Sequence, residues 1–119
     1  MSRLLVVAAI GLLGCQQRPT GPAPLVSLRV SGLELALVPA PGARINARLK
    51  PTIELLNGTR IVFDQGRVDA DSAYFAEPPR AANPTGTIPE GTLRIGICPA
   101  GLEVCQSLEL PVAEIVASP

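Results

Sequence analysis

The chain has 119 residues, which is enough for one small domain, and its ten basic side chains balance ten acidic ones. It contains three Cys and no His, which excludes Ser-His-Asp and Cys-His catalysis and zinc sites of four Cys or of Cys with His. A net charge of zero without a basic cluster argues against a nucleic-acid partner, and we expect neither a metal nor a cofactor. The odd number of cysteines needs an explanation, because exported domains normally pair their cysteines.

The N-terminus has the pattern of an export signal. After Arg3, residues 4–13 form an unbroken apolar run, LLVVAAIGLL. Ten helical residues span about 15 Å, half of a hydrocarbon core, which is the size of a signal-peptide hydrophobic region. The run ends in Leu12-Leu13-Gly14-Cys15, which resembles the bacterial lipobox, in which the cysteine is lipidated and becomes the mature N-terminus. We therefore predict a lipoprotein signal peptide over residues 1–14 and lipidation of Cys15, which anchors the chain to a membrane.

The residues after Cys15 predict a tether. Residues 15–24 comprise the lipidated Cys and a segment with three Pro and one Gly, which is typical of an extended, semi-stiff spacer. Gln16, rather than Asp, resembles the default for outer-membrane lipoproteins of Gram-negative bacteria, so we expect the periplasmic face of the outer membrane. The alternatives are a Gram-positive envelope, an ordinary signal peptide that leaves Cys15 free, or a buried core helix over the apolar run.

Residues 25–116 carry the period-two alternation of β-strands, and Pro or Gly interrupts every candidate helix. We predict strands at 26–30, 33–37, 45–49, 53–56, 59–63, 93–97 and 108–112. Turns are predicted at 39–42 and at Asn57-Gly58, a β-bulge or a tight turn is predicted at Gly32, and residues 64–91 are expected to be mostly irregular. Six or seven short strands favour an all-β fold, a small antiparallel immunoglobulin-like β-sandwich, with an open barrel as the alternative and 117–119 as a tail.

Cys98 and Cys105 are predicted to form a disulfide across a C-terminal hairpin. If they face each other, Ile95 lies opposite Leu108, so apolar residues pair on both strands. Both cysteines then fall on the phase opposite to the core set, on the outer face of the hairpin or at its edge. Directly opposed strand residues have Cα atoms about 4.5–5.5 Å apart, within disulfide range, and export to an oxidising compartment permits the bond.

The spacing of the two cysteines leaves two interpretations open. Closing an eight-residue ring contributes about 2–2.5 kcal/mol in the chain-entropy model, which suits a structural staple that never turns over. Bridges between adjacent strands are often strained, and strained, exposed disulfides are the labile ones, which suits a redox-active pair.

The hairpin over residues 93–112 resembles the end of the N-terminal, immunoglobulin-like domain of the thiol:disulfide interchange protein DsbD. In that family a strand ends in a redox Cys, a short loop with Ala and Gly follows, and a second Cys opens the last strand, as Cys98 and Cys105 do here. Upstream, residues 41–46 resemble the family's glycine-led central strand, and residues 71–77 resemble the aromatic loop that caps the cysteine pair.

This resemblance implies a function. The family domain accepts electrons through the pair and passes them to periplasmic partners, so Cys98 and Cys105 would exchange with a periplasmic thioredoxin-like protein while Tyr74 and Phe75 shield them. Together with the lipobox-like residues, the resemblance implies a lipid-anchored thiol-disulfide exchange or redox-partner module of the cell envelope. The alternative is a non-enzymatic structural or binding lipoprotein in which the disulfide is only a staple. The aromatic pair has its own alternative, in which one ring packs on the core.

Overall fold

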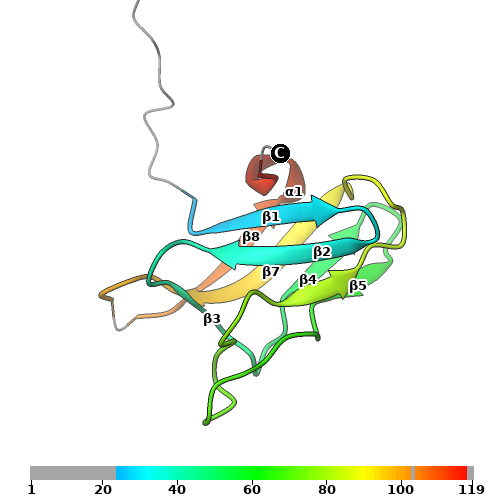
Figure 1. Ribbon diagram of the computed structural model, residues 1–119. Coiled ribbons are helices and arrows are strands. Elements are labelled where there is room, and N and C mark those ends of the chain that lie inside the picture. Colours follow the sequence, from blue (N-terminus) through cyan, green and yellow to red (C-terminus); the bar gives the residue numbers. More distant parts are fainter. Residues whose placement is uncertain (1–23, 103, 118–119) are drawn as a thin grey trace, which may run out of the picture.

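The computed structural model describes residues 24–102 and 104–117, which form two antiparallel β-sheets packed face to face (Figure 1). The first sheet has three strands in the order β1 (Val26–Ser31), β2 (Glu34–Pro39) and β6 (Arg80–Ala82). The predicted lipobox, with Cys15, and most of the predicted tether lie outside the described residues. No helix in the described part of the chain is long and apolar enough to cross a membrane.

The second sheet has five strands with β7 at its centre. They are β3 (Arg44–Ile45), β4 (Thr52–Leu55), β5 (Arg60–Val62), β7 (Gly91–Cys98) and β8 (Gln106–Pro111). One side of β7 pairs with β3 and then β4, and the other side pairs with β8. Ile95 lies opposite Leu108, as predicted from the cysteine spacing. The antiparallel immunoglobulin-like sandwich with a C-terminal disulfide hairpin is therefore confirmed.

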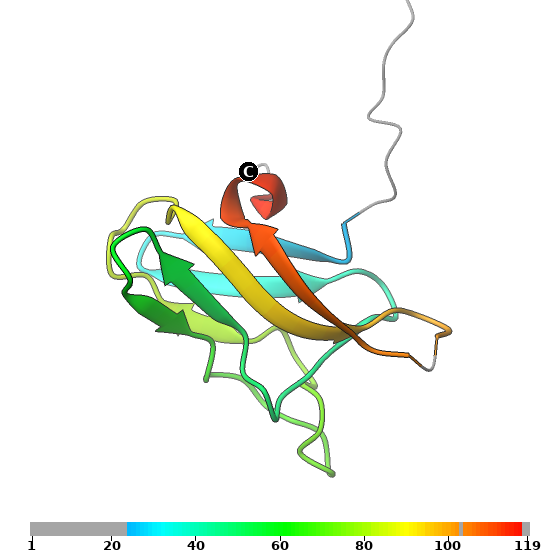
Figure 2. The same cartoon turned by 180° about the vertical axis from the view of Figure 1, so that it is seen from behind.

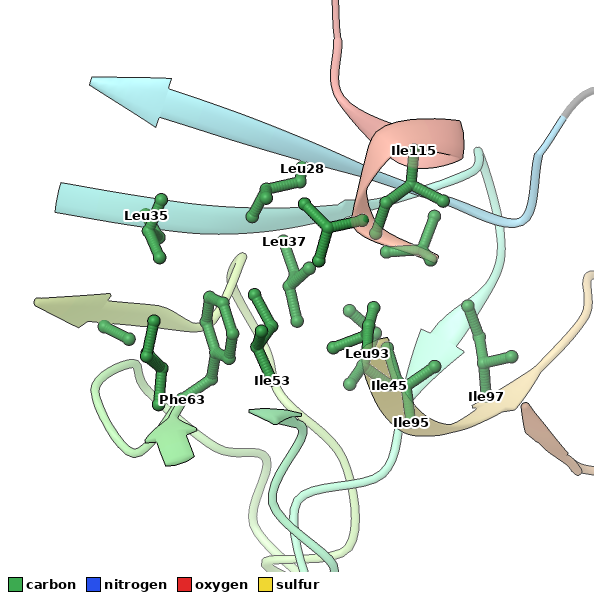
Figure 3. Packing of buried hydrophobic residues seen from close by; sticks show 14 residues of the cluster. Leu28, Leu35, Leu37, Ile45, Ile53, Phe63, Leu93, Ile95, Ile97 and Ile115 are labelled. Atoms are coloured by element: carbon green, nitrogen blue, oxygen red, sulfur yellow. The ribbon is translucent and has the colours of Figure 1, made fainter. Parts of the chain in front are cut away.

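The core lies between the sheets and is almost entirely aliphatic (Figure 3). Leu28, Leu35 and Leu37 point down from β1 and β2 onto Ile53, Phe63 and the β7 side chains of the opposite sheet. The alternating residues point inward because successive side chains of a strand face opposite sides. The buried cluster contains Val26, Leu28, Leu35, Leu37, Ile45, Ile53, Ile61, Phe63, Ala81, Leu93, Ile95, Ile97, Val112 and Ile115.

The C-terminal residues cover one side of the sandwich. After β8 the chain forms the short helix α1 (Val112–Ile115), whose first and last residues are buried against the core. Val116 then forms a parallel bridge with Leu28, and the Ala117 N–H donates to the Leu28 carbonyl at 2.9 Å. The outer edge of β1 is thereby covered.

Three predicted elements differ from the structure. The predicted strand at 45–49 stops at Ile45, because the Asn46 Oδ1 accepts the N–H groups of Arg48 and Leu49 and turns the chain away from the sheet. The predicted last strand ends before Val112, which begins α1. Strand β6 was not predicted, since its three residues follow two prolines and carry no alternating pattern of useful length.

Candidate functional site

The disulfide joins the two ends of the β7–β8 loop. Cys98 is the last residue of β7, Cys105 directly precedes β8, and their Cα atoms are 4.0 Å apart. The predicted disulfide is confirmed. The loop lies at the end of the long hairpin, well away from α1 (Figure 2).

The turn between β2 and β3 supports this loop. Gly42 has a backbone φ of 79°, which residues other than glycine rarely adopt. A Cβ built on it would lie 2.8 Å from the Cβ of Ala100. The absence of a side chain at Gly42 therefore lets the loop approach the turn. The predicted turn at 39–42 thus has a second use, because it fixes the position of the disulfide loop.

The two cysteines have unequal exposure. Both lie on the outer face of the sheet, since Ile97 next to Cys98 points into the core. Cys98 is nevertheless only 1% exposed, whereas Cys105 is exposed. The predicted outer-face position thus does not leave the Cys98 side chain open to solvent. Cys98 lies between Arg44 of β3 and its bonded partner, and a loop crosses above it.

The covering residue is Tyr74. Its hydroxyl lies 3.6 Å from the Cys98 Sγ and 3.9 Å from the Cys105 Sγ. Sulfurs joined in a disulfide carry no hydrogen, so the Tyr74 O–H is the donor and the sulfurs are weak acceptors. The phenolic hydroxyl therefore lies within donor range of the bond that would break in thiol-disulfide exchange.

Backbone hydrogen bonds fix Tyr74 in this position. The Ala47 N–H donates to the Ala73 carbonyl at 2.8 Å, and the Phe75 N–H donates to the Ile45 carbonyl at 3.0 Å. We call residues 73–75 the cap segment. The cap segment lies along the edge of β3 that does not pair with β7. Because successive side chains of an extended segment point to opposite faces, Tyr74 and Phe75 point in opposite directions.

Phe75 is not over the sulfurs. It is half-buried and packs against the hydrophobic core. The structure therefore divides the two adjacent rings, one over the disulfide and the other on the core. Of the two residues that the resemblance implied as a shield, Tyr74 is the one whose side chain contacts the sulfurs.

Asp69 holds the loop that carries the cap segment. Its Oδ1 accepts the Ala73 N–H at 3.1 Å, and its backbone N–H donates to the Tyr74 carbonyl at 2.9 Å. The acidic stretch DQGRVDAD would ordinarily be a solvated loop, but Asp69 is half-buried and orders the turn. An Asp that bonds to main-chain N–H groups a few residues ahead is a common turn device, and only its partners in space identify it here.

Arg44 is a site residue that sequence reasoning missed. Its guanidinium carbon lies 4.3 Å from the centroid of the Tyr74 ring, and Arg44 is directly opposite Cys98 in the β3–β7 pair. Within the described residues the ion pairs are Arg80 with Glu77 and Arg94 with Glu109, so no described carboxylate neutralises Arg44. The alternation around Ile45 could have placed Arg44 on the outer face, but the register against Cys98 depends on the folded sheet.

Comparisons with protein families, with curated proteins and with solved structures found no match to this chain. The site is therefore interpreted from its own geometry. It consists of one exposed and one buried sulfur, a phenolic hydroxyl directed at both, and a guanidinium stacked on the phenol.

Proposed function

We propose that this protein is a lipid-anchored thiol-disulfide exchange module of the cell envelope that works through the Cys98–Cys105 pair. The observation that carries the proposal is the Tyr74 hydroxyl, which lies within 3.9 Å of both sulfurs. A hairpin staple gains its stability from ring closure alone and has no use for a donor aimed at the bond. The resemblance of the hairpin to the DsbD domain supports the same reading.

The unequal exposure of the sulfurs sets the order of events. A thiolate of a partner dithiol attacks the exposed Cys105 Sγ, the bond to Cys98 breaks, and a mixed disulfide forms between the partner and Cys105. Cys98 leaves as a thiolate and takes up a proton. The partner's second thiolate then attacks its own sulfur in the mixed disulfide and releases Cys105, so two electrons and two protons move from the partner to this protein.

Tyr74 and Arg44 would assist the leaving sulfur. Negative charge grows on the Cys98 Sγ as the disulfide breaks, and a hydrogen bond to a charged acceptor is stronger than one to a neutral acceptor. The Tyr74 O–H is already directed at that sulfur at 3.6 Å. The Arg44 guanidinium on the phenol ring adds a positive charge beside it, and cations near a cysteine favour its thiolate.

The envelope location rests on the N-terminal sequence. The apolar run before Cys15 and the lipobox-like residues 12–15 support lipidation of Cys15 and attachment to the periplasmic face of the outer membrane. A periplasmic thioredoxin-like protein is the partner class that suits this location. Export also places the pair in an oxidising compartment, where a disulfide resting state is stable.

A structural lipoprotein is the second candidate. The short ring, the nearly complete burial of Cys98 and the packing of the loop on Gly42 favour a staple that holds the hairpin end closed. In that case the protein presents a binding surface and the sulfurs never exchange.

The reduction potential of the pair separates the two candidates. The full chain carrying Cys15→Ser retains Cys98 and Cys105 as its cysteines and is equilibrated with glutathione or dithiothreitol buffers. An exchange module is expected in the range of known thiol-disulfide proteins, about −270 to −120 mV. A value below about −300 mV, with no electron exchange with periplasmic oxidoreductases, would sink the proposal.

A matched pair of variants tests the order of attack. With Cys98→Ser, Cys105 remains accessible and should form a mixed disulfide with glutathione disulfide rapidly. With Cys105→Ser, the remaining thiol is buried under Tyr74 and should react at least about tenfold more slowly. Equal rates would contradict attack at Cys105.

A further inference from the structure

The outer edge of β8 is open. β8 pairs with β7 on one side, and no other strand of the described residues pairs with it. Figure 2 shows it as the outermost strand beside β7. The edge of β1, by contrast, is covered by residues 116–117. An uncovered edge strand is a template for pairing with another extended chain.

The register identifies the free backbone groups. The Asn46 N–H donates to the Gly96 carbonyl at 2.9 Å, so the polar backbone groups of Gly96 point toward β3. Ser107 lies opposite Gly96, so its own N–H and C=O point away from β7. Two residues on, Glu109 repeats this orientation. The edge therefore offers donors and acceptors beside the disulfide.

A strand added at this edge would bring a cysteine to the exposed sulfur. Neighbouring antiparallel strands place directly opposed Cα atoms about 4.5–5.5 Å apart, which is within disulfide range. Cys105 directly precedes β8 and carries the exposed sulfur. A partner cysteine opposite Cys105 would thus have the separation that a mixed disulfide needs. The same strand would cover Leu108 and Leu110, which are only half-buried.

The side chains beside the edge suggest the partner's chemistry. Val104 next to Cys105 is 73% exposed, which gives the edge an apolar end. A groove of about 370 Å³ on the adjoining face is lined in part by Ser107 and Lys50. Arg94 and Glu109 in the same groove pair with each other at 3.4 Å, while Lys50 pairs with no carboxylate of the described residues. A carboxylate two residues from the partner's cysteine would lie beside Ser107, at the rim of this groove, on the same face of the sheet as Lys50.

We infer that the β8 edge is the docking strand for the redox partner, and that it takes an extended, cysteine-containing segment with an acidic residue two positions from the cysteine. This inference rests on the proposed function. Main-chain hydrogen bonds to Ser107 and Glu109 would supply affinity, and the groove would supply selectivity.

A peptide tests the edge directly. The probe is an extended ten-residue peptide of alternating Thr and Val with one Cys and a Glu two residues away, the Cys being activated as its thionitrobenzoate disulfide. The protein is the reduced full chain with Cys15→Ser and Cys98→Ser. The Cys105 thiolate attacks the peptide's cysteine sulfur, forms the mixed disulfide and expels thionitrobenzoate, whose absorbance gives the rate. The control peptide is N-methylated at the amides that would face β8.

If the peptide pairs with the β8 edge, the unmodified peptide should react about tenfold faster than the methylated one. Methylation removes about two hydrogen bonds between the peptide backbone and β8. Ser107→Pro, which removes an outward N–H, should bring the ratio near one, whereas Ser107→Ala should retain it. If the unmodified and methylated peptides react at nearly equal rates with the parent protein, the proposal that β8 is the docking strand is overturned, whatever the variants do. Concentration-dependent dimers that the peptide dissociates would assign the edge to a second copy and overturn the choice of partner.

Failure of the edge and failure of the proposed function give different results. If the peptide rate ratio is near one and the reduction potential of the Cys98–Cys105 pair lies in the exchange range, only the docking role of β8 is refuted. A tenfold ratio beside a potential below about −300 mV retains the peptide-binding edge and removes the redox function.

Discussion

Reduction of the Cys98–Cys105 disulfide should lower the free energy of unfolding by less than the loss of the ring-closure contribution alone. The bond closes a ring of eight residues, because its cysteines are seven positions apart. The chain-entropy model gives about 2.5 kcal/mol at 25 °C for a ring of that size. A staple should therefore make the oxidised form more stable than the reduced form by about this amount.

Tyr74 is expected to reduce this difference. In the oxidised protein its hydroxyl donates to disulfide sulfurs, which are weak acceptors, at 3.6 and 3.9 Å. After reduction, when Cys98 is a thiolate, the same hydroxyl faces a charged acceptor, and a hydrogen bond to a charged acceptor is stronger by about 1 kcal/mol than one to a neutral acceptor. The stability difference should then fall to about 1.5 kcal/mol. Tyr74→Phe keeps the ring, removes the hydroxyl and should restore about 2.5 kcal/mol.

Urea denaturation of the oxidised and reduced full chain, each with Cys15→Ser, measures both differences. The thermodynamic cycle converts them into reduction potentials, because about 1.4 kcal/mol corresponds to 30 mV for a two-electron couple. The folded protein should thus be harder to reduce than its unfolded chain by about 30 mV, and by about 50 mV in Tyr74→Phe. A difference of about 2.5 kcal/mol in both proteins would show that the hydroxyl does not favour the reduced form.

Four further predictions concern single residues. Gly42→Ala should cost about 1–2 kcal/mol in urea denaturation, because its φ is positive and its Cβ would meet Ala100; Ala100→Gly should recover part of the loss. Asn83→Ala should cost about 1–3 kcal/mol, since the buried amide donates to two backbone carbonyls that would lose their partner. Phe63→Ala should cost about 3–5 kcal/mol by leaving a cavity in the core. Cys15→Ser should release the protein from membranes in fractionation, and unchanged partitioning would contradict lipid anchoring.

Local sequence patterns predicted the parts of the fold that depend on neighbouring residues. The Asn57-Gly58 turn between β4 and β5 and the Gly32 turn between β1 and β2 are short-range signals, and both hairpins formed. The register of β7 and β8 followed from one assumption, that Cys98 faces Cys105, because a single pair fixes every other pair in a hairpin.

The missing parts of the prediction depend on contacts between distant segments. Strand β6 pairs with β2 across more than forty residues, and its three residues have no pattern that distinguishes them from a loop. Asn46 ends β3 through a side-chain bond that competes with the regular alternation around it. The site itself shows the same limit. The cysteine pair was evident from spacing, but the contact of Arg44 with Tyr74 exists only when β3, β7 and the cap segment are together.

Strand β3 is the place where fold and candidate chemistry meet. Its two residues point to opposite faces: Ile45 points into the core, and Arg44 faces outward beside Cys98. The Ile45 carbonyl also accepts the Phe75 N–H, which fixes the cap segment and hence the Tyr74 hydroxyl. A hairpin staple requires only β7, β8 and the loop between them. The cap segment, its anchoring on β3 and the guanidinium on the phenol add nothing to ring closure, and they lie beside the sulfur that would leave in the proposed exchange. The contribution of the Tyr74 hydroxyl to the reduced state is therefore the quantity on which the choice between a staple and an exchange module depends.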